Sequence, residues 1–180
     1  MKKEIIQKIE IPEGVEIEIK ENKLKVKGEK GEIEREFNLR KLDFEKKGNF
    51  IMIGNKKATK KEKKRINTIT AHIQNMIKGV QNEFEYQLKI CSSHFPMTVE
   101  IKDKEATIKN FLGEKINRKA KIRDNVRVNI EGEIIKINSY DKEAAGQTAA
   151  NFEKATRIKN RDRRVFQDGI FLTSKAGREI

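Results

Sequence analysis

The sequence predicts an α+β fold of two tandem duplicated domains, each an antiparallel-rich β-sheet packed against one main α-helix. Three observations lead to this prediction. Apolar and polar residues alternate in several short runs, which is the period of half-buried strands. Two longer segments carry apolar residues at spacings of three and four, which is the period of amphipathic helices. One stretch of sequence also recurs further along the chain.

The recurrence relates residues 17–32, IEIKENKLKVKGEKGE, to residues 99–114, VEIKDKEATIKNFLGE, at a constant shift of 82 positions. Identical residues include Glu18 and Glu100, and Gly31 and Gly113. In both copies a hairpin, a turn and further strands are followed by a helix. We therefore expect a domain over residues 1–82 and a second domain over residues 83–180.

In the first copy, strands are expected where apolar residues alternate with charged ones. These runs are Val15–Lys20, Leu24–Lys27 and Ile33–Phe37, followed by the apolar segment Phe50–Ile53. A helix follows, because an apolar stripe is formed by Ile66, Ile69, Ile73, Ile77 and Val80. Thr59 and Glu62 have the spacing of a capping box at its start, and Lys78 and Gly79 suit its end.

In the second copy, the corresponding strands are expected at Phe84–Ile90, Lys119–Ile122, Val126–Ile130 and Ile134–Ile137. The second helix is expected from about Ser139, with Asn138 or Ser139 as its N-cap. One face of it is apolar and carries Ala145, Thr148, Ala149, Phe152 and Ala155.

The formal net charge of +13 and the pI of about 9.7 indicate a polyanionic partner. This charge is concentrated in two blocks, because residues 41–80 carry a net +8 and residues 154–180 carry +5. Residues 1–40 and 81–153 are each neutral. The partner is therefore expected to contact those two blocks.

The C-terminal block is predicted to be a basic tail that binds a phosphate backbone, because arginine forms paired hydrogen bonds with phosphate. Its candidate residues are Lys154, Arg157, Lys159, Arg161, Arg163, Arg164, Phe166, Gln167 and Asp168. A merely solubilising tail is the alternative. Apolar residues such as Ile170 and Phe171, and the turn signal at Asp168-Gly169, argue against that alternative.

A secondary basic patch surrounds the start of the first helix. It comprises Lys56, Lys57, Lys60, Lys61, Lys63, Lys64 and Arg65. Cations at a helix N-terminus oppose the helix dipole. Either an anionic partner neutralises this patch or the start of the helix frays, and the sequence leaves both explanations open.

The sequence does not favour an enzyme, a metal site or a cofactor. Cys91 is the single cysteine, which excludes an intrachain disulfide and fits a reducing compartment. His72 and His94 are the two histidines, and Cys91 with His94 gives only two potential ligands, fewer than zinc requires. No phosphate-binding glycine loop, signal peptide or membrane span is recognisable, so we expect a soluble cytoplasmic protein with no small-molecule substrate.

Five segments together resemble one known family. They are AHIQNMIKGV (71–80), SHFPMTV (93–99), NFLGEK (110–115), DKEAAGQTAAN (141–151) and KNRDRRVFQDGIF (159–171). In this order, and with the duplication, the chain is similar over nearly its whole length to the L-six family of large-subunit ribosomal proteins, in its archaeal and eukaryotic form. The segments do not choose between those two sources.

The resemblance implies a non-enzymatic constituent of the large ribosomal subunit. It implies contacts with large-subunit RNA beside the sarcin–ricin hairpin, near the base of the factor-binding stalk, and with neighbouring ribosomal proteins. The implied RNA contacts are the second domain, its basic tail and the loop from Asn110 to Lys115. The resemblance implies no RNA contact for the patch at residues 56–65. Two other functions are weighed beside this one: a free-standing RNA-binding module and a basic adaptor for an acidic surface.

Overall fold

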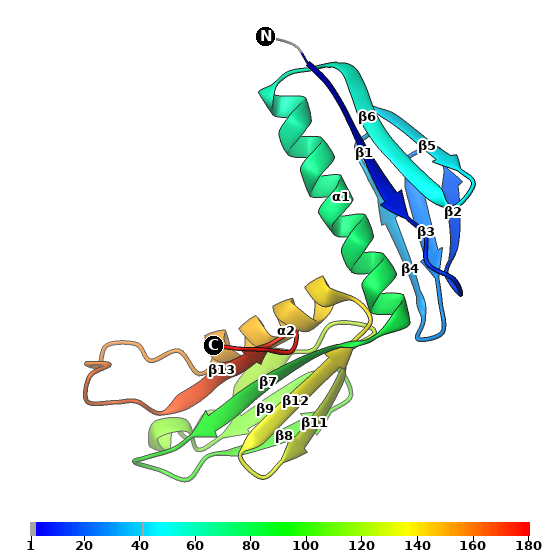
Figure 1. The fold of residues 1–180 in the computed structure, drawn as a ribbon. Helices are drawn as coiled ribbons and strands as arrows, with labels where there is room; N and C mark the ends of the chain where they lie inside the picture. Colours follow the sequence, from blue (N-terminus) through cyan, green and yellow to red (C-terminus); the bar gives the residue numbers. More distant parts are fainter. Residues whose placement is uncertain (1–2, 41) are drawn as a thin grey trace. The chain divides into compact units, whose positions relative to one another are not determined.

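The structure, a computed structural model, describes residues 3–40 and 42–180. Residues 1, 2 and 41, which belong to the first predicted domain, lie outside the described residues. The chain forms two compact units that divide between Glu83 and Phe84. In each unit a long helix packs against antiparallel strands (Figure 1), so the α+β class and the duplication predicted from the sequence are confirmed.

The first unit contains two three-stranded antiparallel sheets and one helix. One sheet has the order β1-β6-β5, formed by β1 (Lys3–Glu10), β6 (Phe50–Ala58) and β5 (Asp43–Lys47). The other has the order β2-β3-β4, formed by β2 (Glu16–Lys20), β3 (Lys23–Lys27) and β4 (Glu32–Glu36). Helix α1 (Lys60–Gln81) packs against strands of both sheets.

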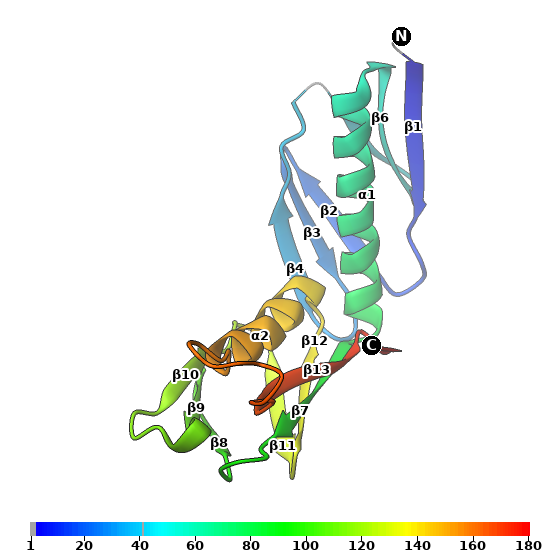
Figure 2. The same ribbon diagram turned by 90° about the vertical axis from the view of Figure 1, so that its left-hand side faces the viewer.

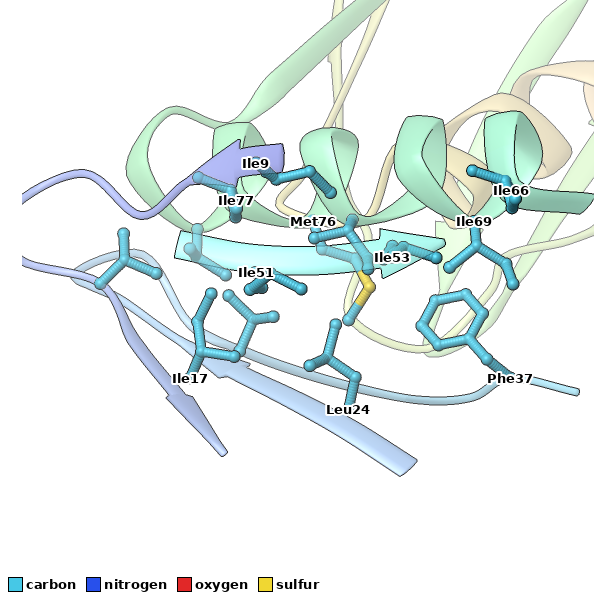
Figure 3. Close-up of a cluster of buried hydrophobic side chains, with 14 of the residues drawn as sticks. Ile9, Ile17, Leu24, Phe37, Ile51, Ile53, Ile66, Ile69, Met76 and Ile77 are labelled. Atoms are coloured by element: carbon cyan, nitrogen blue, oxygen red, sulfur yellow. The ribbon is translucent and has the colours of Figure 1, made fainter. Parts of the chain in front are cut away.

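The core of the first unit lies between α1 and the sheets. All five residues of the predicted stripe on α1 are buried, and Met76 joins them. They pack against Ile51 and Ile53 of β6 and against Ile17 and Leu24 of the β2–β3 hairpin (Figure 3). Burying large aliphatic side chains stabilises a fold by about 1.5–3 kcal/mol each. This stripe therefore explains why α1 forms despite its basic start.

The start of α1 is capped as the sequence predicts. The backbone N–H of Thr59 donates to Oε2 of Glu62 at 2.8 Å, and the capping box is complete. Glu62 also places an anion in the first turn, where the helix dipole favours one. The helix begins at Lys60, so the structure shows an ordered start and not a frayed one.

The second unit repeats this plan and adds two strands. Its larger sheet has the order β11-β12-β7-β13-β14 and its smaller sheet the order β10-β9-β8. Helix α2 (Lys142–Ala155) packs against both, and a short 3-10 turn, η1 (Phe111–Gly113), follows β9. The strands are β7 (Phe84–Cys91), β8 (Thr98–Lys102), β9 (Glu105–Lys109), β10 (Arg118–Lys121), β11 (Arg127–Glu131), β12 (Ile134–Ser139), β13 (Gly169–Lys175) and β14 (Arg178–Glu179).

The duplication extends to backbone conformation. The hairpins β2–β3 and β8–β9 begin and end at positions that differ by the same 82 residues found in the sequence. Their turns contain Glu21 and Asp103, which share a left-handed conformation with φ of 51° and 54°. Few non-glycine residues adopt positive φ, so this match is specific to the two copies.

Three expectations are corrected by the structure. Strands β1, β5, β13 and β14 were not predicted, and β1 already begins at Lys3. Asp141 is the N-cap of α2, in place of Asn138 or Ser139, because its side chain accepts from the backbone N–H of Glu143 at 2.9 Å. The basic segment is a loop and not a tail, since β13 follows it and pairs with β7.

Candidate nucleic-acid interface

Five of the eight basic residues in the C-terminal block lie on one exposed loop. Residues 157–168, here called the arginine loop, connect the end of α2 to β13 (Figure 1). Lys154 lies in the last turn of α2, directly before it. The predicted cationic side chains are all exposed: Lys154, Arg157, Lys159, Arg161, Arg163 and Arg164. The loop thus presents a dense positive surface to solvent.

Asp168 anchors the C-terminal end of the arginine loop inside the protein. It is only 2% exposed, and its carboxylate accepts hydrogen bonds from the backbone N–H groups of Ser93 and His94. Nδ1 of His94 also lies at 2.5 Å from Oδ2 of Asp168. Burial raises the pKa of this carboxyl, but the hydrogen bonds from His94 and Ser93 outweigh it and hold the pKa below its usual value of 3.8. Asp168 therefore fixes the loop, and its carboxylate is occupied within the protein.

Phe166 holds the C-terminal part of the loop against the segment that follows β7. Its ring stacks on the imidazole of His94 with centroids 4.9 Å apart. The guanidinium of Arg161 lies 4.8 Å from the centroid of Phe166. Arg164 is held locally, since its Nη2 lies 3.0 Å from Oδ2 of Asp162. These contacts give the loop a defined path, although most of its arginine side chains face solvent.

The N-terminal end of the loop is fixed by Thr156 and Arg118. The Thr156 hydroxyl accepts from the backbone N–H of Ile170 at 2.9 Å, which ties the end of α2 to β13. Arg118 donates through Nη1 to the carbonyls of Ala155 at 2.9 Å and Arg157 at 3.0 Å. Its Nε and Nη2 form a paired interaction with Glu114 at 2.8 and 2.6 Å. This last contact lowers the pKa of the Glu114 carboxyl against a smaller effect of burial.

Arg118 was missed as a site residue by the sequence analysis. It satisfies carbonyls at the C-terminal end of α2, where the helix dipole favours a cation. Its guanidinium also lies 4.2 Å from the centroid of Phe111, in η1. The four-residue spacing from Glu114 to Arg118 could have indicated their ion pair. It could not have indicated the contact of Arg118 with the end of α2.

The loop from Asn110 to Lys115 belongs to the same surface. Asn110 has a positive φ of 59°, and its side-chain amide donates to the carbonyl of Pro96 at 2.9 Å. Gly113 has a φ of 77°, and a side chain at this position would contact the ring of Phe95. Lys115 is exposed. Residues 92–97 thus contact both the arginine loop, through His94, and the 110–115 loop, through Pro96.

A groove of about 890 Å³ lies beside the arginine loop. Its apolar lining includes Phe166, Ile170 and Phe171, while Lys154, Arg157 and Arg163 contribute cationic side chains. The lining also includes Gln167, which is exposed, and Cys91, which is a free, half-buried thiol. A surface that combines cations with aromatic rings suits a phosphodiester backbone and exposed bases.

The secondary basic patch belongs to the first unit. Its six lysines are exposed, with Lys56 and Lys57 on β6 and the others on the first turns of α1. Arg65 is half-buried, and its Nη2 donates to Oδ1 of Asn38 at 2.8 Å. The lysines are thus available to an anionic partner, whereas Arg65 supports the turn at residues 38–40.

Residues 3–40 and 42–180 contain neither a metal-binding cluster nor a helix able to cross a membrane. In that part of the chain, no group of three or more His, Cys, Asp and Glu side chains is arranged to hold a metal ion. No helix described there has the length and apolar composition needed to cross a membrane.

Comparison with known proteins identifies the family of this chain. The sequence pattern of the family described as ribosomal protein L6 matches residues 11–83 and 95–169, one match for each unit. The chain belongs to the ribosomal protein L6 family. The first match begins after β1 and the second after β7, and both helices lie within the matches. The second match ends at the start of β13, so the family pattern includes the whole arginine loop.

Several curated relatives match this chain over nearly the full length of both sequences. "Large ribosomal subunit protein uL6" of Methanobrevibacter smithii is 47% identical over 171 residues, covering 95% of this chain and 96% of the relative. The proteins of the same name from Staphylothermus marinus and Sulfurisphaera tokodaii are 48% and 44% identical over 172 residues. They cover 93% and 95% of this chain and 93% and 92% of their own lengths.

Proposed function

We propose that this chain is a structural constituent of the large ribosomal subunit and that it binds large-subunit ribosomal RNA without catalysis. Family membership and the uL6 relatives support the assignment to the subunit. The observation that carries RNA binding is the anchored arginine loop. Its ends are tied to the fold by Thr156 and Asp168, while its cationic side chains face solvent.

The proposed mechanism is electrostatic positioning. Cationic side chains of the loop neutralise phosphates and release counterions, which supplies affinity without reading sequence. The ordered loop lowers the entropic cost of binding, because its path is already fixed by Phe166 and Asp168. Duplex RNA is recognised mainly by shape and backbone contacts, and this surface fits that mode.

Within this surface the proposed RNA contacts are Lys154, Arg157, Lys159, Arg161, Arg163, Arg164 and Lys115. Phe166, Gln167 and the backbone near Asn110 border them. Asp168 and Arg118 are proposed as positioning residues, because their side chains are engaged within the protein. The six exposed lysines of the first unit are a secondary patch for a further anionic contact.

The finer location follows the family resemblance. We place the chain near the sarcin–ricin hairpin and the stalk base, where it supports the region that binds translation factors. Its further partners there are neighbouring large-subunit proteins, and its compartment is the cytoplasm. These statements rest on the resemblance and on the match of motifs in residues 93–99, 110–115 and 159–171.

The deciding experiment is sedimentation of the tagged full-length chain with ribosomal subunits. We expect co-sedimentation with large subunits at low salt and release only at high salt, as counterion release requires. A chain that binds RNA but stays at the top of the gradient would support the free-standing RNA-binding module. A chain that binds acidic protein surfaces and ignores RNA would support the basic adaptor.

A further inference from the structure

Within the described residues, one edge of the sheet that contains β1 is open in the first unit. The equivalent edge in the second unit is occupied by an added strand, β13. Strand β7 pairs with β12 on one side and with β13 on the other. Its counterpart β1 pairs with β6, and no other strand of residues 3–40 and 42–180 pairs with it (Figure 2). The two strand pairs correspond, because β6 and β12 are each the strand that directly precedes the helix of their unit.

In the second unit, β13 is held by α2 as well as by β7. The backbone N–H of Ile170 donates to the Thr156 hydroxyl at 2.9 Å, and that of Leu172 donates to Oε1 of Glu153 at 3.1 Å. Polar side chains at the end of the helix thus satisfy backbone groups of the added strand. The space between helix and strand edge is therefore a strand-binding position in this fold.

The first unit has a groove of about 470 Å³ at the corresponding position. It runs between the C-terminal half of β1 and the last two turns of α1. Its floor is formed by the buried side chains of Ile9 and Ile77. The polar side chains around it can form hydrogen bonds with a peptide backbone. Its remaining lining is Lys8, Glu10, Pro12, Gln74, Lys78 and Gln81.

We propose that the edge of β1 and this groove bind an extended segment of another polypeptide, which adds as an antiparallel strand to β1. Exposed strand edges bind extended peptides through main-chain hydrogen bonds. The buried floor favours short side chains on the inward face of the segment. Lys8 and Lys78 flank the groove and favour a carboxylate at its rim.

The charge of this surface favours a polypeptide over RNA. The lining of the groove is nearly balanced in charge, because Lys8 and Lys78 are partly offset by Glu10. A phosphodiester backbone gains little from such a balanced surface. A peptide strand, in contrast, can pair with the alternating N–H and C=O groups along β1.

The test uses the full-length chain in assembled large subunits and therefore rests on the proposed function. Three proteins are compared: wild type, Gln74→Trp, which fills the groove from an exposed position on α1, and Thr68→Trp. Thr68 is also exposed on α1 but does not line the groove, so its variant is the matched control. Hydrogen exchange of residues 3–10 is measured in the free chain and in the subunit.

We expect amide exchange across β1 to slow by at least about tenfold in subunits for wild type and Thr68→Trp. Gln74→Trp should co-sediment but lose this protection. A photoreactive benzoylphenylalanine at position 8 should cross-link to one segment of one other polypeptide. Failure of the wild-type chain to co-sediment with large subunits would contradict the proposed function itself. Co-sedimentation without protection, protection that survives in Gln74→Trp, or a cross-link to RNA or to a second copy would each overturn the inference alone.

Discussion

The carboxylate of Asp168 binds the imidazole of His94 across 74 residues of sequence, and Phe166 stacks on the same imidazole. This pair joins the end of the arginine loop to the segment that follows β7. The contact explains how an exposed, highly charged loop keeps one path. Residues of this surface therefore have two different roles. Some face solvent and can contact a ligand, and others hold the solvent-facing residues in position.

Replacing His94 with Ala should weaken RNA binding by about tenfold, the equivalent of one lost charge-assisted hydrogen bond. The slope of log affinity against log salt should stay unchanged, because no phosphate contact is removed. The measurement is RNA binding over a salt series, with circular dichroism as a folding control. His94→Asn retains a side-chain donor and should recover part of the affinity. A flatter slope in His94→Ala would instead identify His94 as a phosphate contact.

The combined change of Arg161, Arg163 and Arg164 to Ala should lower both the affinity and the salt dependence. Each lost phosphate contact reduces the slope by roughly 0.7–0.9, so three should reduce it by about 2 to 3. The fold should persist, because these side chains are exposed. The comparison variant replaces Lys60, Lys61, Lys63 and Lys64, and we expect a smaller change there. The opposite order of effects would assign RNA binding to the first unit.

Replacing Asp168 with Asn should destabilise the second unit by about 1–3 kcal/mol near pH 7, because a buried, hydrogen-bonded carboxylate is lost. The folded-state pKa of Asp168 is lowered below 3.8. Its ionised form therefore stabilises the fold above about pH 4, and this stabilisation is lost as the pH falls through the lower, folded-state pKa. The stability difference between wild type and Asp168→Asn, measured by urea unfolding, should shrink below pH 4. A constant difference from pH 7 to pH 3 would show that the charge of Asp168 does not matter.

A fragment of residues 84–180 should unfold cooperatively, because it has its own core and sheets. A fragment of residues 84–168 should not, although it keeps α2 and every arginine of the loop. It lacks β13, which pairs with β7 and buries Ile170 to 1% exposure. Thermal melts of the two fragments make the comparison. A cooperative melt of the shorter one would mean that residues 169–180 are dispensable for folding.

Local patterns in the sequence were sufficient to predict much of the fold. The stripe from Ile66 to Val80 predicted α1, and its burial is what the 3.6-residue period implies. The position of β13 was not readable, because Ile170 and Leu172 follow a run of arginines that resembles a disordered tail. β13 pairs with β7, about 80 residues earlier in the chain, and such a long-range contact leaves no periodic pattern in the local sequence.

For the candidate site, sequence analysis found the charges but not the scaffold that holds them. The cations of residues 154–164 were visible as a net positive block. The bonds of Asp168 to His94 and of Arg118 to Arg157 join segments far apart in the chain. Asp168 was predicted as an RNA contact beside a turn, because Asp-Gly is a turn signal, and its burial could not be read from that signal.

The position of β13 after the arginine loop has a consequence for synthesis. Synthesis runs from the N-terminus, so all the loop arginines are incorporated before β13, which completes the larger sheet of the second unit, is translated. Until residues 169–175 leave the exit tunnel, Ile170 cannot bond to Thr156 and β13 cannot pair with β7, so the loop is not yet tied to the sheet. The ordered RNA-binding form is therefore reached only by chains whose translation has continued through β13, so products that terminate earlier expose cations without the geometry that orients them.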